Sequence, residues 1–273
     1  MLIYFTKREV LLILSILSVQ ISACSDYYDY SPYQTNASQT ALTQKAIDRL
    51  EESSSEEFVP FNFTIIADLH NHYDEGRRVV GHINQFSLSE FSVVAGDFTD
   101  MGLLQEFEWS HSVMANLKMP YFLAIGNHDY LSNGSDVYHK MYGPKNFSFI
   151  YRKVKFIFFD NNQPEFGGKE PNLNWLEAEL LGTDSLQHVI IVSHVSFFDS
   201  RVSETIRVRL EQLMFDYNVS LTIHGHAHTR SEQQRSRSDG GVTKMLINGS
   251  IDRHDYSLVN VDQDDIAIHE IQL

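Results

Sequence analysis

Two aspartates, Asp97 and Asp100, have the type and spacing of metal ligands. Val93 to Ala95 form an apolar run that predicts the end of a buried strand. Gly96 then allows a sharp turn of the backbone, and Asp97 and Asp100 follow it. A carboxylate at the end of a buried strand is costly unless an opposite charge compensates it. A hard metal cation would do so, and one carboxylate can hold two, so we expect Asp97 to bridge a two-metal site.

Four further clusters along the chain carry the same residue types. They are Asp68-Leu69-His70, Gly126-Asn127-His128-Asp129, Ser193-His194 and Gly225-His226-Ala227-His228. Imidazole and carboxylate ligands suit Zn, Fe and Mn, and the lack of thiolate argues against a closed structural zinc site. Two metals roughly 3.5–4 Å apart can activate a water and hold phosphate oxygens during an in-line displacement.

Each cluster follows a segment that predicts a strand. These strands are expected at Phe61–Ala67, Phe91–Ala95, Tyr121–Ile125, Val189–Val192 and Leu221–Ile223. Between them, apolar spacing predicts helices at 76–88, Leu103–Leu117, Trp175–Leu181 and Arg207–Tyr217. Because sites in open α/β sheets form beyond the carboxyl ends of strands, five segments should deliver polar side chains to one edge of the sheet.

The remaining segments are predicted to be rich in strand. Phe147–Ile150 and Phe156–Phe159 lie close together and predict a hairpin, and Val242–Ile247, Tyr256–Val261 and Ile266–Ile271 predict strands only. The chain therefore has the pattern of an α/β domain with β-rich additions.

The ordered clusters resemble the calcineurin-like metallophosphoesterase superfamily. Its pattern is DxH, GDxxD, GNH(D/E), H and GHxH, and this chain has all five in that order over residues 64–228. A lone DxH is a weak signal, whereas the full ordered set, each member after a strand, is specific. The resemblance implies an α/β sandwich in which two packed mixed β-sheets are flanked by helices.

The resemblance also implies which residues hold two divalent ions, of Mn, Fe or Zn. One metal would take Asp68, His70, Asp97 and His228, and the other would take Asp97, Asn127, His194 and His226. The glycines at 96, 126 and 225 would let the loops pass close to the metals. No Tyr stands in the first two motifs, so the metal chemistry of the purple acid phosphatases is not expected.

By resemblance, His128 is a catalytic residue rather than a ligand. It would donate a proton to the leaving-group oxygen and contact phosphate, and Asp100 would hold its ring in the correct tautomer. The alternative is a structural histidine in a tight turn. Asp129 is expected to stabilise the loop by a hydrogen bond, and His224 either packs in the core or lines the site.

One position departs from the family pattern. In members that are protein phosphatases, an Arg that binds phosphate usually follows GDxxD, and here Met101 stands in its place. This argues against a protein phosphatase and leaves open which group binds the non-bridging oxygens. Arg201 and Arg207 follow the fourth motif, where either one of them reaches a phosphate or both lie on a solvated helix face.

Several aromatic residues near the motifs are expected to serve packing. Tyr130, Tyr138 and Tyr142 follow the third motif, and stacking on a substrate ring is the alternative for them. Trp109 and Trp175 lie in helical patterns and are expected in the core.

The N-terminus predicts export and a lipid anchor. A basic pair at 7–8 precedes the short apolar run Val10–Val19, and Ile21-Ser22-Ala23-Cys24 follows. This resembles the bacterial lipobox, in which the signal is cut before a Cys that is then lipidated; an ordinary signal peptide is the alternative. Ser25 after Cys24 favours the outer membrane, by resemblance to enterobacterial sorting. The expected location is the bacterial cell envelope, facing the periplasm or the surface.

The expected domain organisation has three parts. They are a lipoprotein signal peptide at 1–23, a polar tether with a possible short helix at 24–57, and a metallophosphoesterase domain at 58–273. The single cysteine, Cys24, excludes an internal disulfide. The net charge of −15 argues against nucleic acid as a partner, which needs clustered Lys and Arg.

The sequence therefore predicts a lipid-anchored enzyme that hydrolyses phosphate esters with two metals. Its small phosphorylated substrate would be a phosphomonoester or a cyclic-nucleotide-type phosphodiester. The choice between the two depends on residues in loops, whose geometry the sequence does not give. Two alternatives stay open: a non-catalytic binding or structural lipoprotein on a phosphoesterase scaffold, and a nuclease. The membrane contact would be made through lipidated Cys24.

Overall fold

The computed structural model describes residues 6–8, 31–162, 165, 167, 170–237 and 240–273. Thr35–Leu273 form one compact unit, and Met1–Gln34 are a separate unit. The predicted lipobox, at 21–24, lies outside the described residues. No helix in the described ranges combines the length and the apolar character needed to span a membrane.

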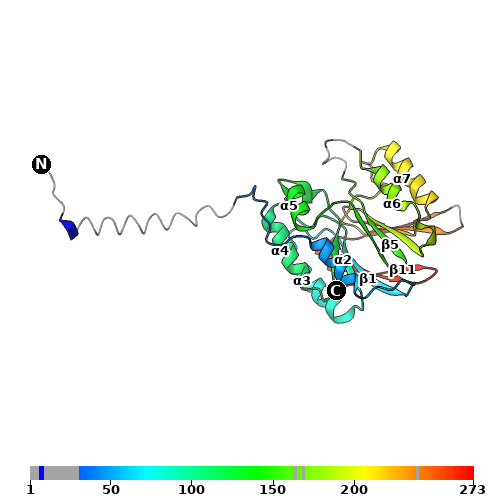
Figure 1. The fold of residues 1–273 in the computed structure, drawn as a ribbon, viewed down its shortest axis with the longest axis horizontal. Helices are drawn as coiled ribbons and strands as arrows, with labels where there is room; N and C mark the ends of the chain where they lie inside the picture. Colours follow the sequence, from blue (N-terminus) through cyan, green and yellow to red (C-terminus); the bar gives the residue numbers. More distant parts are fainter. Residues whose placement is uncertain (1–5, 9–30, 163–164, 166, 168–169, 238–239) are drawn as a thin grey trace. The chain divides into compact units, whose positions relative to one another are not determined.

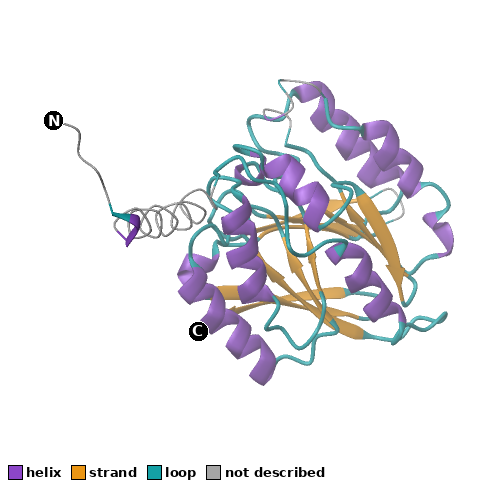
Figure 2. Ribbon diagram, turned by 60° about the vertical axis from the view of Figure 1, so that its left-hand side comes forward, coloured by secondary structure: helices purple, strands orange, loops and turns teal. Residues whose placement is uncertain are grey.

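Two β-sheets form the centre of the compact unit (Figures 1 and 2). The first has the strand order β11-β10-β1-β2-β3. Its strands are β1 (Phe61–Ile66), β2 (Phe91–Val94), β3 (Tyr121–Leu123), β10 (Asp255–Val261) and β11 (Ile266–Gln272). β1, β2 and β3 run parallel, whereas β10 and β11 pair antiparallel, so this sheet is mixed.

The second sheet is also mixed and has the strand order β4-β5-β6-β7-β9-β8. Its strands are β4 (Phe147–Tyr151), β5 (Val154–Phe158), β6 (His188–Val192), β7 (Leu221–His224), β8 (Ser231–Ser236) and β9 (Val242–Ile247). β5, β6, β7 and β9 are parallel, and β4 and β8 pair antiparallel at the two edges. The predicted hairpin is the pair β4 and β5.

Helices cover the outer faces of both sheets (Figure 1). Apolar side chains of α3 (Tyr73–Phe86), α4 (Leu104–Met114) and α5 (Gly134–Met141) pack on the first sheet. Those of α6 (Leu173–Leu180) and α7 (Glu204–Asp216) pack on the second. Between the sheets, residues of both, such as Phe63 and Phe156, form one fully buried core. The fold is therefore the expected α/β sandwich of two packed mixed sheets flanked by helices.

Helix α2 (Leu42–Glu51) belongs to the folded unit, not to a tether. Ala46 and Leu50 are buried in the core between the sheets, and the helix contacts β3 and β4. Those two strands are edges of different sheets, and an exposed edge is a liability that a covering helix removes. The predicted domain start at residue 58 is therefore too late.

Two elements and one side chain differ from the sequence prediction. Helix α5 and strand β8 were not predicted from the sequence. Trp109 was expected in the core but is 50% exposed, and its ring contacts that of Tyr73 edge to face. Trp175 is half-buried and stacks in parallel with Phe159.

Candidate metal centre

The candidate site lies where strand ends of the two sheets meet. Asp68, Asp97 and Asn127 follow β1, β2 and β3 of the first sheet, and His194 and His226 follow β6 and β7 of the second. The backbone N–H of His226 donates to Asp68 Oδ1 over 3.0 Å, which joins the two sheets at this point. The sequence predicted that these side chains gather at the carboxyl ends of the strands of one sheet, whereas the site is shared between strand ends of both sheets.

One predicted ligand set comes together beside β1. Asp68, His70, Asp97 and His228 each offer a ligand atom within 4.8 Å of the others. His70 Nε2 lies 3.3 Å from His228 Nε2 and 3.7 Å from Asp97 Oδ2. His228 Nε2 lies 3.6 Å from Asp68 Oδ1. Two imidazole nitrogens and two carboxylates therefore surround one position that suits a divalent cation.

The other predicted set comes together next to it. Asp97, His194 and His226 offer ligand atoms within 4.8 Å of one another. Asn127 Oδ1 lies 3.1 Å from His194 Nε2, so the amide joins the same group. The Nδ1–H of His194 donates to the Ala95 carbonyl over 2.8 Å. Because Nδ1 is used in this way, Nε2 is the nitrogen left for a metal.

Asp97 lies between the two groups. Its Oδ2 is 3.1 Å from His194 Nε2 and 3.7 Å from His70 Nε2, one histidine from each group. Its Oδ1 accepts the backbone N–H of His128 over 2.9 Å, which fixes the rotation of the carboxylate. One oxygen thus faces both candidate metal positions, the geometry that a bridging ligand requires.

The backbone at the candidate ligands is strained. Positive φ angles are found at five of them: Asp68 (53°), His70 (46°), Asp97 (48°), His226 (70°) and His228 (55°). A residue with a Cβ pays about 1–3 kcal/mol for such a conformation, and strain of this kind gathers at functional sites. The residues with this unfavourable backbone conformation are the same ones whose side chains converge on the candidate metal centre.

Glycines permit the close approach of the loops that carry these side chains. A Cβ at Gly96 would overlap the His194 ring, and one at Gly126 would overlap Asp97. Gly96 also has a φ of 87°, which an L side chain rarely adopts. These glycines therefore let β2, β3 and β6 bring their ligands within contact of each other.

The ionisation of the buried candidate ligands favours the binding of cations. Burial raises the pKa of Asp68 to about 7, so its charged form is costly without a partner. Burial also opposes ionisation of Asp97, yet the positive charge of His194 holds the Asp97 pKa well below its usual range. Although burial opposes it, Asp97 in turn raises the pKa of His194 to about 9. His70 Nδ1 is buried with no hydrogen-bond partner among the described residues. Asp68, whose charge lacks compensation, and the paired Asp97 and His194 thus form a set of buried carboxylates and imidazoles that fits divalent ions.

The predicted acid–base pair, His128 and Asp100, meets through the main chain. The Nδ1–H of His128 donates to the backbone carbonyl of Asp100 over 2.7 Å. The Asp100 carboxylate lies 3.9 Å from that nitrogen but 3.6 Å from His70 Nδ1. Asp100 therefore orients His128 with its carbonyl, and its side chain faces a candidate ligand. His128 Nε2 stays available for proton exchange.

The family model described as "Calcineurin-like phosphoesterase" matches residues 61–230. The chain belongs to this family. It thus carries the domain of a phosphoric ester hydrolase, a family that uses two-metal centres, and both ligand groups are present.

A plant protein is similar in sequence to this calcineurin-like phosphoesterase. Fe(3+)-Zn(2+) purple acid phosphatase 12 of Arabidopsis thaliana is 24% identical over 222 residues, which are 70% of this chain and 46% of that protein. The chain therefore spans about half the length of this curated relative.

Solved structures share the fold of this phosphoesterase. The purple acid phosphatase PPD1 from yellow lupin seeds has a TM-score of 0.60 at 12% identity, covering 80% of this chain and 53% of that one. GAP50, the anchor in the inner membrane complex of Plasmodium, has a TM-score of 0.58 at 15% identity, covering 78% and 84%. At these identities the likeness shows the fold alone.

Several residues support the centre of this phosphoesterase without offering a ligand. Asp129 accepts the backbone N–H groups of Thr99 and Gly126, each over 2.9 Å, and that of Phe98 over 3.2 Å. The Thr99 hydroxyl also donates to Asp129 Oδ1 over 2.8 Å, so the expected loop-stabilising hydrogen bond is confirmed and is one of four. His224 is fully buried and bonds to Ser193, so of its two predicted roles it has the packing one.

The tyrosines after the third motif also serve packing. Tyr138 and Tyr142 are buried, and the Tyr138 hydroxyl donates to the Leu123 carbonyl over 2.6 Å. The Tyr130 hydroxyl donates to Asp160.

Two asparagines that were not predicted as site residues stabilise the ligand loops by hydrogen bonds. Asn161 Nδ2 donates to the Val195 carbonyl over 2.6 Å and its Oδ1 accepts the Val195 N–H over 3.2 Å, next to His194. Asn162 Nδ2 donates to the Ile125 carbonyl over 2.9 Å. Both asparagines follow β5, so the same signal, polar residues just after a buried strand, was present at this strand as well.

Proposed function

We propose that this chain hydrolyses a small phosphate ester with two divalent metals held by the two ligand groups. The observation that supports this most is the position of Asp97 Oδ2 between His70 of one group and His194 of the other. When bound, two such metals activate a water as nucleophile and neutralise the charge of the phosphoryl oxygens.

His128 is proposed as the general acid. Its side chain is 38% exposed, so substrate can reach it, and its ring contacts His70 edge to face with centroids 4.7 Å apart. The carbonyl of Asp100 holds Nδ1 in its protonated form, which directs Nε2 to the proton transfer. Nε2 would give its proton to the leaving-group oxygen as the ester bond breaks.

The substrate is proposed to be a small phosphomonoester or phosphodiester rather than nucleic acid. The chain carries a net charge of −15, which opposes an extended polyanion, while two metals reverse the field only locally. The nuclease hypothesis is checked by incubating the metal-loaded protein with single- and double-stranded polynucleotides.

The cellular location is a separate proposal that depends on the sequence of residues 21–24. We propose export and lipid anchoring through Cys24, with the envelope of a bacterial cell as the location. Cys24→Ser should move the protein from the membrane fraction to the soluble fraction of lysed cells. Unchanged sedimentation of the variant would contradict the anchor.

The enzymatic proposal is tested with the purified protein loaded with Mn²⁺, Zn²⁺ or Fe²⁺. We expect turnover of p-nitrophenyl phosphate or of bis-p-nitrophenyl phosphate, and loss of it with chelator. Asp97→Asn should lose metal and at least about 100-fold in rate, because a bridging ligand matters more than the outer partners whose loss costs 10–100-fold. Asp184→Asn, at an exposed site, is the matched control. Normal metal content and rate in Asp97→Asn would contradict the bridging role.

A scaffold without catalysis is the second candidate, because this fold also occurs in GAP50, the anchor in the inner membrane complex of Plasmodium. Folded, metal-loaded protein with no turnover on a broad panel of esters would favour it. The complete pair of ligand groups favours the enzyme.

A further inference from the structure

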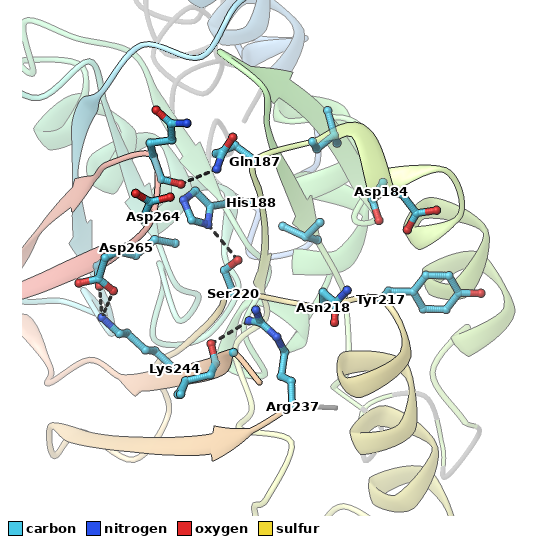
Figure 3. Close-up of a pocket in the computed structure, with 17 residues that line it drawn as sticks. Asp184, Gln187, His188, Tyr217, Asn218, Ser220, Arg237, Lys244, Asp264 and Asp265 are labelled. Atoms are coloured by element: carbon cyan, nitrogen blue, oxygen red, sulfur yellow. Dashed lines mark hydrogen bonds and ion pairs between the residues drawn. The ribbon is translucent and has the colours of Figure 1, made fainter. Parts of the chain in front are cut away.

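A polar cavity of about 500 Å³ lies away from the metal centre (Figure 3). It opens at the start of β6, whereas His194 follows the end of that strand. Basic side chains that line it have protein partners: His188 Nδ1 bonds to the Ser220 hydroxyl over 3.0 Å, and Lys244 pairs with Asp265 over 2.6 Å. With these groups paired, the cavity gives no argument for a ligand.

A second cavity, of about 400 Å³, is formed by parts of both sheets. Residues 229–232, around the start of β8, line it from the second sheet. Three residues line it from the side of the first: Arg253 at the end of the 3-10 helix η5 (Ile251–Arg253), Asp255 at the start of β10, and Glu270 of β11. We call it the Asp255 cavity, and its volume is that of a small-molecule site.

Both sides of the Asp255 cavity continue into the candidate metal centre. Thr229 directly follows the candidate ligand His228, so their Cα atoms are about 3.8 Å apart. On the other side, the Ser250 hydroxyl donates to the Asp68 carbonyl over 3.1 Å. A Cβ on the glycine before Ser250 would lie 3.1 Å from Asp255 Oδ2. The Asp255 carboxylate therefore lies against the loop that holds Asp68, next to one of the two ligand groups.

Asp255 is a buried carboxylate without a hydrogen-bond donor. The residue is 6% exposed, and its Oδ1 is buried with no partner. Within the part of the chain that the structure describes, neither carboxylate oxygen takes part in a hydrogen bond or an ion pair. Burial is the main reason that the pKa of Asp255 is raised, and the charge of Glu270 adds to it. Because buried polar atoms almost always have a partner, this carboxylate lacks a group that a ligand can supply.

The two arginines of the cavity differ in how their charges are compensated. Arg230 donates to Glu232, and its Nε lies 3.6 Å from Glu270 Oε2. Arg253 is exposed, and its guanidinium has no hydrogen bond or ion pair to any described residue. Asp255 lies two residues from Arg253, yet the two do not pair with each other. The wall of the cavity therefore presents one unpaired carboxylate and one unpaired guanidinium.

Two unpaired opposite charges fit a zwitterion better than a metal ion. Among the described residues, the groups of side chains that could hold a metal do not include Asp255, Glu232 or Glu270. An ammonium group has three N–H donors for a carboxylate, and a guanidinium can bind a carboxylate through two parallel hydrogen bonds. An α-amino acid carries both groups on one carbon atom.

We propose that the Asp255 cavity binds the zwitterionic part of an α-amino acid, with its ammonium group on Asp255 and its carboxylate on Arg253. The amino acid is either free or part of a phosphate ester whose phosphoryl group lies at the neighbouring metal centre. The first case is independent of the proposed phosphoesterase function. The second rests on that function and narrows the substrate to phosphomonoesters of amino acids.

Calorimetry of the metal-loaded protein tests the site with L-serine, L-glycerate and ethanolamine. Glycerate has a hydroxyl in place of the ammonium group, and ethanolamine lacks the carboxylate. We expect L-serine to bind about 10- to 100-fold more tightly than either, as for charged hydrogen bonds. Asp255→Asn and Arg253→Ala should each weaken the binding of L-serine by a similar factor. Asp252→Asn, at an exposed position outside the cavity, is the matched control and should bind as the wild type does.

Two results would overturn the site. They are a wild type that binds L-serine no better than glycerate and ethanolamine, and an unchanged affinity for L-serine in both Asp255→Asn and Arg253→Ala. Because Arg253 is exposed, Arg253→Ala tests the site even where thermal unfolding shows that Asp255→Asn is not folded.

Hydrolysis of O-phospho-L-serine and of 3-phospho-L-glycerate separates the two sources of the amino acid. These esters differ only in the ammonium group. If the amino acid is part of the substrate, kcat/KM should be at least about 10-fold higher for O-phospho-L-serine, and Asp255→Asn should remove this preference. If it is free, L-serine should bind equally well with saturating inorganic phosphate present. A wild type without turnover on any ester would contradict the proposed function, and the calorimetry with L-serine would still decide the site.

Discussion

At the residue scale, the tautomer of His128 is set by a group that can only accept a hydrogen bond. The carbonyl of Asp100 lies 2.7 Å from Nδ1, so Nδ1 carries a proton and Nε2 is the nitrogen that exchanges one. A backbone carbonyl is held by the loop and does not change charge with pH. The orientation of the proposed acid is thus independent of the ionisation of the Asp100 side chain.

His128→Ala should keep both metals and lose turnover. His128 offers no atom to either ligand group in which Asp97 takes part, so we expect unchanged metal content. The loss in kcat should be about 10²–10⁴-fold for an alkyl phosphate and much smaller for p-nitrophenyl phosphate, whose leaving group needs no proton. Steady-state kinetics on both esters measure this, and equal losses would rule out the acid role.

Asp100→Asn tests whether the backbone carbonyl and the carboxylate of Asp100 have separate roles, the first toward His128 and the second toward His70. The carboxylate lies closer to His70 Nδ1 than to His128 Nδ1, at 3.6 Å against 3.9 Å. Because partners of a ligating histidine tune its metal affinity, the variant should bind metal about 10- to 100-fold more weakly. The dependence of rate on the leaving group should persist, since the carbonyl remains.

The control for this variant is Asp264→Asn, at an exposed position far along the chain. If Asp100→Asn kept its metal affinity but lost the dependence on the leaving group, the carboxylate would be the group that orients His128.

At the scale of elements, α2 closes the gap between the sheets. Its apolar side chains reach the core at the edges of β3 and β4, and Ser38, ahead of the helix, donates its hydroxyl to Glu108 of α4 over 2.9 Å. Leu50→Ala should therefore destabilise the folded unit by about 2–5 kcal/mol, since Leu50 is only 3% exposed. Urea unfolding measures the change, with Glu51→Ala on the exposed face as control. Equal stability of the two variants would restore the domain start at 58.

The strands, and the convergence of the candidate ligands at their ends, could be predicted from the sequence because two independent signals coincide there. A short apolar run predicts a buried strand, and polar residues that follow it within a few positions are candidates for a site at the end of that strand. The β2 segment and Asp97 show this, as do β7 and His226. The order of the motifs then predicted which segments, far apart in the sequence, contribute to the same candidate site.

The elements that were not predicted from the sequence lack one of these signals. β8 is an edge strand that pairs with β9 and is exposed along most of its length, so it has no alternation of buried and exposed residues. α5 has eight residues, too few for a helical period to stand out, and it begins at a glycine. The assembly of the first sheet depends on long-range pairing such as that of Phe61 in β1 with Val261 in β10, which no local pattern contains.

At the scale of the whole molecule, the candidate centre links the two sheets. Hydrogen bonds cross between them there, from His226 N to Asp68 and from His194 to the Ala95 carbonyl. The same loops carry strained backbone and a carboxyl group, Asp68, whose pKa is raised by burial. Two divalent ions would bring four positive charges to a chain of net charge −15. Metal binding should therefore stabilise the folded chain in addition to its role in catalysis.

Removal of metal should lower the unfolding temperature of the wild type. Each site contributes about 2.7 kcal/mol when free metal is 100-fold above its dissociation constant, because metal binds the folded chain in preference to the unfolded one. Calorimetry before and after chelation, with metal analysis, measures the shift. Asp97→Asn should start at a lower temperature and respond little, whereas Asp184→Asn should respond as the wild type does. If the wild type loses its metal and unfolds at the same temperature, then hydrogen bonds such as those of Asp129 suffice to hold the strained loops, and the centre serves chemistry alone.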